Sequence, residues 1–360
     1  MPPERRPASE DALAQILREA REPVAVRGGG TRGAPAGGAV LDTTALTGIR
    51  LHEPGALTIV AAAGTPLAEV EAALAAHHQH LAFEPPRTGP GSTIGGVVAA
   101  NASGPRRVVA GACRDSLIGV RFVDGAGTVV KNGGRVMKNV TGIDLTKLMA
   151  GSRGALGVLT EVAFKVLPRP ETRATVTLRG LDDTRAVAAM AAALGSPFEV
   201  TGAAHGPDGT HLRIEGFAGS VADRAERLAH VLAPFGTADV TEGEGPWPAI
   251  RDLDGFADAP GDLWRLSVRP SAAPGAVARA GALAHRMDWG GGRVWLVMPP
   301  GTDLRARLGA VPGHATRVRR TEADGIADLP PEVPALAALS AGLRARFDPR
   351  GILNPGPTTA

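Results

Sequence analysis

The residues best suited to chemistry lie in one glycine-rich stretch, Glu84 to Gly104, which reads EPPRTGPGSTIGGVVAANASG. Glycines let backbone N–H groups turn toward one point and let a ligand approach the main chain closely. Ser92, Thr93, Asn101 and Ser103 add short polar groups. Amide dipoles and hydroxyls that converge in this way bind phosphate oxygens. The stretch therefore predicts an anion-binding loop, and a solvent-exposed glycine turn is the alternative.

Two further glycine clusters lie beside strand-like segments. The first, PVAVRGGGTRG over residues 23–33, formally contains G-x-G-x-x-G at Gly28, Gly30 and Gly33. A dinucleotide-binding motif of this form needs a helix to begin there, but the APAGG that follows is a poor helix start, so the Rossmann interpretation fails. The other cluster, AGSRGALGVLT over residues 150–160, precedes an apolar run. The order of the three clusters is more informative than any one of them.

Together these segments resemble the FAD-binding family of the para-cresol methylhydroxylase and vanillyl-alcohol oxidase type. The resemblance covers about residues 10–170 and the C-terminal tail. Within the family the chain is similar to the FAD-binding, E-type subunits of bacterial glycolate oxidases, through its short length, Leu263–Ser267 and the sequence DWGGGRVW over residues 288–295. Four segments carry the family match: Arg27-Gly-Gly-Gly-Thr31, Ser92-Thr-Ile-Gly-Gly96 with Asn101-Ala-Ser-Gly104, Gly151-Ser-Arg-Gly-Ala-Leu-Gly157, and Phe347-Asp-Pro-Arg-Gly-Ile-Leu-Asn354-Pro-Gly356.

The resemblance implies an α+β fold: a two-subdomain FAD-binding domain of the methylhydroxylase type, followed by a smaller α+β domain. It implies that the first two clusters hold the FAD pyrophosphate, that Gly154 to Val158 face the adenosine half, and that Asn354 approaches the isoalloxazine. The cofactor-binding residues it assigns are Arg27, Gly28, Gly29, Gly30, Thr31, Arg32, Thr88, Gly89, Ser92, Thr93, Gly95, Gly96, Asn101, Ser103, Gly104, Gly154, Gly157, Val158 and Asn354.

The resemblance also implies that FAD is held non-covalently. Relatives with covalent flavin commonly carry a histidine just after the first glycine cluster, where this chain has Thr31. Cysteine and tyrosine are the other common attachment points. Cys113, the one cysteine, lies elsewhere in the pattern, and the chain has no tyrosine.

The composition is that of a globular protein, with 44 % hydrophobic and 21 % charged residues and a formal net charge of +3. Its 360 residues are enough for two domains. Basic and acidic residues are interspersed, without the basic run or aromatic ladder of a nucleic-acid surface. No stretch approaches a transmembrane span and the N-terminus has no secretory signal, so we expect a cytoplasmic protein. The resemblance implies that it is also found peripherally at the inner membrane, through a complex with partner subunits.

The first part of the chain predicts short strands and helices around the glycine clusters. We expect a helix over 10–20 capped by Ser9, strands over 24–26, 40–42 and 57–62, and a helix capped by Thr65 with Pro66 at its first position. A hairpin over 117–131 and a short helix over 145–149 follow. His77, His78 and His80 lie near a helix end, which favours solvated residues over a metal site.

Pro168-Arg169-Pro170 marks a domain boundary. Beyond it, strands over 175–178, 211–214, 263–268 and 293–297 alternate with helices over 183–194, 221–232, 276–286 and 303–308. This weak internal symmetry predicts an antiparallel sheet of split β-α-β, ferredoxin-like type with helices on one face. Residues 242–260 are expected to connect its halves. The domains expected are residues 1–169 for FAD binding, 170–333 for substrate or docking, and 334–360 for a last helix and a tail returning to the flavin.

Two functions remain open. The resemblance implies an FAD-binding subunit of a glycolate oxidase, an oxidoreductase complex that also contains a larger catalytic flavin subunit and an iron–sulfur subunit. The alternative is a stand-alone FAD-dependent dehydrogenase of a small 2-hydroxy acid such as D-lactate. No catalytic residue or metal ligand is assigned, because a catalytic base must be identified by geometry and the histidines at 205, 211, 230, 285 and 314 stand alone in sequence. Trp264 and Trp289 are candidates for docking anchors or for the core.

Overall fold

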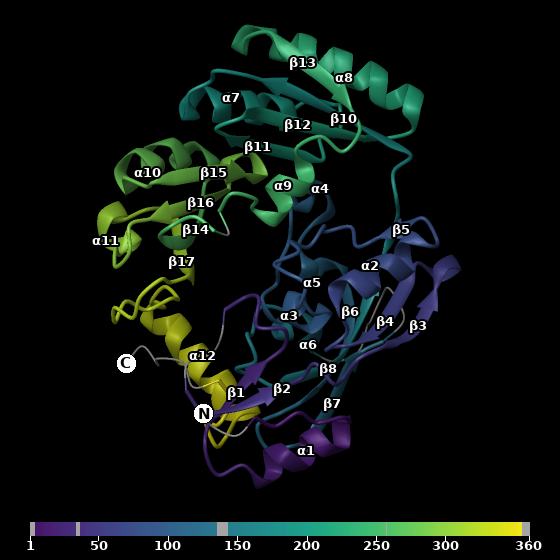
Figure 1. The fold of residues 1–360 in the computed structure, drawn as a ribbon, viewed down its shortest axis with the longest axis vertical. Coiled ribbons are helices and arrows are strands. Elements are labelled where there is room, and N and C mark those ends of the chain that lie inside the picture. Colours follow the sequence, from purple (N-terminus) through teal and green to yellow (C-terminus); the bar gives the residue numbers. More distant parts are fainter. Residues whose placement is uncertain (1–3, 34–36, 135–142, 257, 355–360) are drawn as a thin grey trace. The chain divides into compact units, whose positions relative to one another are not determined.

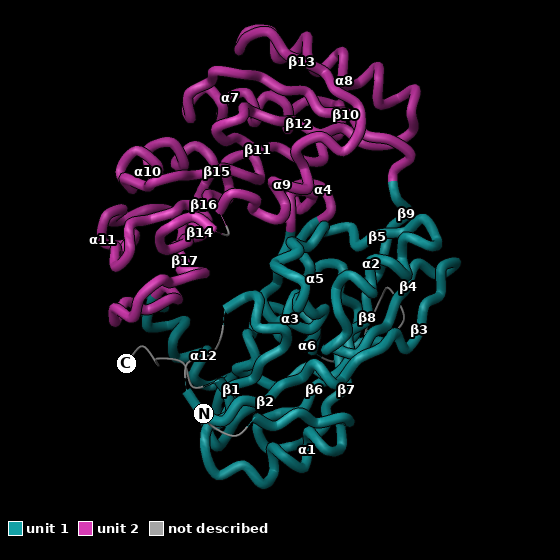
Figure 2. Tube along the Cα trace, viewed as in Figure 1, with its two compact units in different colours: residues 1–103, 111–169, 331–360 teal, residues 104–110, 170–330 magenta. Residues whose placement is uncertain are grey.

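The computed structural model describes residues 4–33, 37–134, 143–256 and 258–354, and the chain forms two compact units (Figure 2). Unit 1 comprises residues 1–103, 111–169 and 331–360, and unit 2 comprises residues 104–110 and 170–330. Residues 135–142, between the predicted hairpin and the short helix over 145–149, lie outside the described residues, as do Pro355 and Gly356 of the C-terminal motif.

The first layer of unit 1 joins the N-terminus to the C-terminal tail. Ser9 accepts a hydrogen bond from the Ala12 amide and caps α1 (Glu10–Glu19), as expected, because its hydroxyl satisfies a free helical N–H group. Strands β1 (Val24–Arg27) and β2 (Ala39–Asp42) pair in parallel. Leu13 and Leu17 of α1 pack with Val24, Leu41, Ile352 and Leu353, so the tail completes this core.

The second layer of unit 1 is a five-stranded antiparallel sheet in the order β3-β4-β8-β6-β7. Its core contains Phe83, Phe122 and Phe164 and the apolar residues of the helices against it. The remaining elements of unit 1 are β3 (Ile49–Glu53), β4 (Thr58–Ala62), α2 (Leu67–Ala75), β5 (Gln79–His80), α3 (Ile94–Ala99), α5 (Cys113–Ser116), β6 (Leu117–Val123), β7 (Val129–Gly133), α6 (Leu145–Met149), β8 (Val158–Lys165), β9 (Leu167–Pro168) and α12 (Pro334–Phe347).

Two local predictions in unit 1 need correction. Thr65 is not a helix cap, because its hydroxyl donates to the Ala62 carbonyl and accepts from the Gly48 amide, and Pro66 takes the N-cap position. The central glycine stretch also contains a helix that its composition did not predict. Thr93 caps this helix, α3, by accepting from the Gly96 amide at 3.2 Å.

Unit 2 is built on one eight-stranded antiparallel sheet in the order β13-β10-β12-β11-β15-β16-β14-β17, which Figure 1 shows with helices against it. The first four strands with α7 and α8 form one β-α-β-β-α-β repeat, and the last four with α10 and α11 form a second. The ferredoxin-like prediction is therefore confirmed. The elements are α4 (Arg107–Ala110), β10 (Thr172–Leu178), α7 (Asp183–Leu194), β11 (Gly202–Gly206), β12 (Gly209–Gly216), α8 (Ala218–Leu232), β13 (Ala238–Glu242), α9 (Trp247–Asp252), β14 (Asp262–Val268), α10 (Ala273–Ala280), β15 (Ala284–Asp288), β16 (Arg293–Met298), α11 (Leu304–Leu308) and β17 (Gly313–Arg319).

The helix predicted over 276–286 was wrong in its second half. Helix α10 ends at Ala280, Gly281 adopts a left-handed φ of 57°, and the chain continues as β15. A glycine in this conformation is a common helix stop. Strand β15 joins the two repeats through its pairing with β11. The segment over 242–260 was also more than a connection, since it contains α9.

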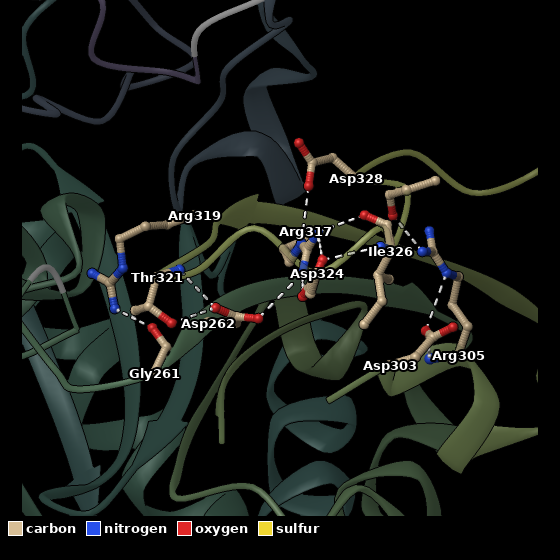
Figure 3. A network of polar contacts seen from close by, with 11 residues as sticks. Gly261, Asp262, Asp303, Arg305, Arg317, Arg319, Thr321, Asp324, Ile326 and Asp328 are labelled. Carbon is tan, nitrogen blue, oxygen red and sulfur yellow. Dashed lines mark hydrogen bonds and ion pairs between the residues drawn. The ribbon is translucent and has the colours of Figure 1, made fainter. Parts of the chain in front are cut away.

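A network of ion pairs and hydrogen bonds around the buried Arg317 joins β14, β17 and residues 321–328 of unit 2 (Figure 3). Arg317 of β17 is buried and binds Asp262 at 3.3 Å and Asp328 at 2.9 Å, as well as Asp324 and the Ile326 carbonyl. Asp262 also accepts from the amide and hydroxyl of Thr321. These bonds hold residues 321–328 against β14 and β17.

Candidate functional site

The first two glycine clusters meet in unit 1. An ideal Cβ on Gly29 would lie 1.5 Å from the Gly91 carbonyl oxygen, so the two loops pass each other at backbone contact. Arg32 Nη1 donates to Ser92 Oγ at 2.6 Å, and Thr88 Oγ1 donates to Thr31 Oγ1 at 3.1 Å. Residues about 60 positions apart in sequence thus form one polar, glycine-walled surface, as an anion cradle requires.

Glycine at the neighbouring positions is required by close packing. A Cβ on Gly28 would lie 2.7 Å from Thr93 Oγ1, and one on Gly95 would lie 2.6 Å from the Ala63 carbonyl oxygen. Gly30 and Gly89 have φ values of 68° and 90°, which side chains with a Cβ rarely adopt. Gly28 thus allows the two loops to approach each other closely, and Gly95 allows the second loop to pack against Ala63.

The end of the central stretch is fixed by hydrogen bonds inside unit 1. Asn101 has a left-handed φ of 47°, and its Oδ1 accepts from the Arg114 amide at 3.1 Å. Ser103 Oγ accepts from the Cys113 amide at 2.9 Å. Burial raises the pKa of the Cys113 thiol, so this cysteine is a neutral core residue. Gly104, the next residue along the chain, is grouped with unit 2.

The third cluster meets the tail at Asn354. Asn354 Oδ1 accepts from the Val26 amide at 2.5 Å, and its Nδ2 donates to the Arg153 carbonyl at 2.5 Å. A Cβ on Gly154 would lie 2.6 Å from that Nδ2. The Val158 side chain packs in the core beside Val24. The structure thus joins β1, the third cluster and the tail through the side chain of Asn354.

Ser152 is a candidate binding residue that the sequence reasoning missed. It lies inside the third glycine cluster, and its hydroxyl is buried without a hydrogen-bond partner among the described residues. A buried hydroxyl without a partner costs free energy, so a ligand group that bonds to it would bind favourably. Its position between Gly151 and Arg153 was the available sequence signal.

Arg27, the first residue of the predicted set, forms two ion pairs within unit 1. Its guanidinium binds Glu4 at 2.6 Å and Asp42 at 3.2 Å. Asp42 also accepts from the Thr44 amide and hydroxyl, which anchors the turn after β2. The side chain of Arg27 therefore ties the N-terminal segment to β2.

Two histidines of unit 2, His205 and His285, share one carboxylate partner. His205 and His285 both contact Asp183, with Nε2 to Oδ1 distances of 3.4 and 2.9 Å. His205 Nδ1 also lies 2.9 Å from Thr210 Oγ1, and burial lowers its pKa. Among the residues that the structure describes, no three potential metal ligands lie close enough together to hold a metal ion. This holds also for the histidines near 77–80.

His211 should make the stability of unit 2 depend on pH. Burial lowers its pKa from 6.5 to about 4, with nearby Arg179 and Arg286 acting in the same direction. Between these values the unfolded chain binds a proton that the folded chain does not, so stability falls as the pH drops from 6.5 toward 4. Between pH 7 and pH 5 the wild type should lose about 2 kcal/mol more than His211→Asn.

Denaturant titrations followed by tryptophan fluorescence would measure this difference, because all four tryptophans lie in residues 247–295 of unit 2. Equal losses for the two proteins would show that His211 does not carry the effect.

Known proteins resemble this chain in sequence and in fold. Residues 4–133 match the model of a family described as FAD binding domain. The chain is 37 % identical over 344 residues to glycolate oxidase subunit GlcE of Escherichia coli (strain K12), covering 93 % of this chain and 92 % of that protein. It is 44 % identical over 85 residues to glycolate oxidase subunit GlcD of Bacillus subtilis (strain 168), covering 24 % of this chain and 18 % of that one.

A solved structure of alkyldihydroxyacetonephosphate synthase shares the fold. It superposes with a TM-score of 0.71 at 15 % sequence identity, covering 98 % of this chain and 75 % of that one. Across the described residues, none of the helices has both the length and the apolar character needed to cross a bilayer.

Proposed function

This chain belongs to the FAD-binding family of the para-cresol methylhydroxylase and vanillyl-alcohol oxidase type, and from that premise we propose that it is the FAD-binding subunit of a glycolate oxidase. The observation that carries the proposal is the 37 % identity to a glycolate oxidase subunit, which extends over nearly the whole of both chains. In the proposed reaction glycolate loses two electrons and two protons and becomes glyoxylate.

FAD is the cofactor of this family, and the residues of unit 1 fit it. The two crossing loops offer glycine-walled backbone and the hydroxyls of Thr31, Ser92 and Thr93, the groups that suit a pyrophosphate. The hydroxyl of Ser152, which has no hydrogen-bond partner within the described ranges, is a further group that a cofactor would satisfy. We assign the pyrophosphate to the first two clusters and the adenosine half to Gly154–Val158, where Asn354 contacts Gly154.

When bound, FAD supplies a group that can accept and pass on electrons, and the chain binds and orients it. Attachment is non-covalent in this proposal, because Thr31 has no ring nitrogen at the position where covalent relatives carry a histidine. We assign residues 1–169 with 334–360 to FAD binding and residues 170–333 to substrate or partner contact. The proposed partners are a larger catalytic flavin subunit and an iron–sulfur subunit, at the cytoplasmic side of the inner membrane.

The isolated, flavin-loaded chain should oxidise glycolate and D-lactate at negligible rates. The Escherichia coli protein that matches this chain over nearly its full length is named as a subunit of glycolate oxidase. We therefore place substrate oxidation in the larger partner. Anaerobic stopped-flow mixing with each acid would measure this, with the oxidised flavin band as the signal. Rapid bleaching by either acid without a partner would replace the subunit proposal with a stand-alone dehydrogenase.

The matching positive experiment is reconstitution. Cells that produce all three proposed subunits should show glycolate-dependent dye reduction, and omission of this chain should remove it. Full activity from the two other subunits alone would contradict the proposal.

A further inference from the structure

The central glycine-rich stretch, which ends at Asn101–Ser103, is the proposed cofactor loop. The chain passes from unit 1 to unit 2 directly after it. Residues 104–110, which include α4, belong to unit 2, and the chain returns to unit 1 at Gly111 (Figure 2). Asn101 and Ser103 are held on their unit 1 side by the Arg114 and Cys113 amides. The conformation of the loop end therefore also depends on what holds residues 104–110.

Trp289 is the first contact that holds this segment. Its indole N–H donates to the Gly104 carbonyl at 2.9 Å. The guanidinium groups of Arg107 and Arg293 stack on its ring, 4.4 and 4.0 Å from the centroid. One side chain thus contacts Gly104, the first residue of the segment, through a hydrogen bond and Arg107, the first residue of α4, through a cation–π interaction.

The sequence DWGGGRVW over residues 288–295, which the proposed function leaves unused, builds the position of this indole. Trp289 has a left-handed φ of 56°, a conformation that is costly for a residue with a Cβ and persists where the surroundings impose it. Asp288 Oδ1 accepts from the Trp289 amide at 2.7 Å and its carboxylate pairs with Arg293. Gly290 and Gly291 also have positive φ values, so the turn depends on them.

Glu215 is the second contact. It lies on β12, its side chain is 4 % exposed, and it forms an ion pair with Arg106. Arg213 and Arg173 approach the same carboxylate at 3.5 and 3.7 Å. A buried carboxylate surrounded by three arginines is a fixed point of the sheet, so Arg106 is held to a rigid element.

We propose that Trp289 and Glu215 are positioning residues for the cofactor loop, acting through Gly104 and Arg106 to set the conformation of Asn101–Ser103 and thereby the affinity and environment of bound FAD. This inference rests on the cofactor site assigned above. It gives unit 2 a role in cofactor binding that follows from the contacts of Trp289 with Gly104 and Arg107 and of Glu215 with Arg106, which lie inside that unit.

Trp289→Phe tests the proposal most directly, because it keeps an aromatic ring for the arginines and removes the N–H group. We expect FAD to bind about fivefold more weakly, the loss of one hydrogen bond. Glu215→Gln should weaken binding about tenfold, because Arg106 loses its carboxylate. Both variants should change the visible circular dichroism of the bound flavin. The affinity is measured by titrating the full-length apoprotein with FAD and following flavin fluorescence.

Trp295→Phe is the matched control, because the Trp295 indole N–H is buried without a partner among the described residues. It should leave FAD affinity and the flavin spectrum unchanged. If Trp289 only stabilised the fold, Trp289→Phe would lower the unfolding midpoint and leave FAD affinity and the flavin spectrum unchanged. Wild-type affinity and a wild-type spectrum in Trp289→Phe would therefore overturn the proposal. If that variant does not fold, Glu215→Gln decides by the same two readouts. A Gly29→Ala protein that keeps its flavin would instead contradict the cofactor site itself.

Discussion

Replacing Gly29 with alanine should leave the purified protein without its flavin. The added Cβ would lie 1.5 Å from the carbonyl oxygen of Gly91, far inside any contact distance. Because that oxygen belongs to the backbone, no side-chain rotation relieves the overlap, and the two loops must separate. Their separation pulls apart the Arg32–Ser92 and Thr31–Thr88 hydrogen bonds, so the proposed pyrophosphate site is lost. The ratio of flavin to protein absorbance measures the result.

Gly55→Ala is the control for this experiment. Gly55 is also in unit 1, has no heavy atom within 4 Å of an added Cβ and does not have a left-handed φ. It should retain flavin at the wild-type ratio. Circular dichroism must show that Gly29→Ala is folded, and a folded Gly29→Ala with stoichiometric FAD would refute the placement of the cofactor between these loops.

Replacing Arg317 with methionine should lower the free energy of unfolding of unit 2 by about 3–5 kcal/mol. Arg317 and Asp262 are both fully buried, and the substitution keeps an apolar stem but leaves the Asp262 carboxylate buried without its cation (Figure 3). The bonds from Arg317 to Asp324, Asp328 and the Ile326 carbonyl are lost at the same time. Denaturant titration followed by tryptophan fluorescence reports on this unit selectively, since it holds all four tryptophans.

Arg179→Met provides the comparison, because Arg179 pairs with Asp239 at the surface, where their side chains are 69 % and 60 % exposed. Exposed pairs contribute little, so this variant should lose less than about 1 kcal/mol. Equal losses for the two variants would mean that the Arg317 network adds nothing beyond a surface ion pair.

The alternation of apolar and polar residues predicted most elements of both units, because local composition decides whether a segment can bury a face. The predicted cap Ser9 is confirmed, since a cap is a contact over two or three residues that the local sequence contains. The sequence left open whether Trp264 and Trp289 are docking anchors or core residues. Trp264 is fully buried in the core, which the second alternative predicted, and Trp289 contacts Gly104 and two arginines.

The sequence by itself determined which segments are rich in glycine and short polar residues, and therefore where an FAD-binding surface would come from. Only the tertiary structure decided how those segments meet. Gly29 and Gly91 touch across about 60 residues, and Trp289 reaches Gly104 across 185. Contacts of this kind leave no periodic pattern in the chain, because they depend on where strands and turns end in space. The same holds for Thr65, whose hydroxyl is used by Ala62 and Gly48 rather than by the helix that its sequence position favours.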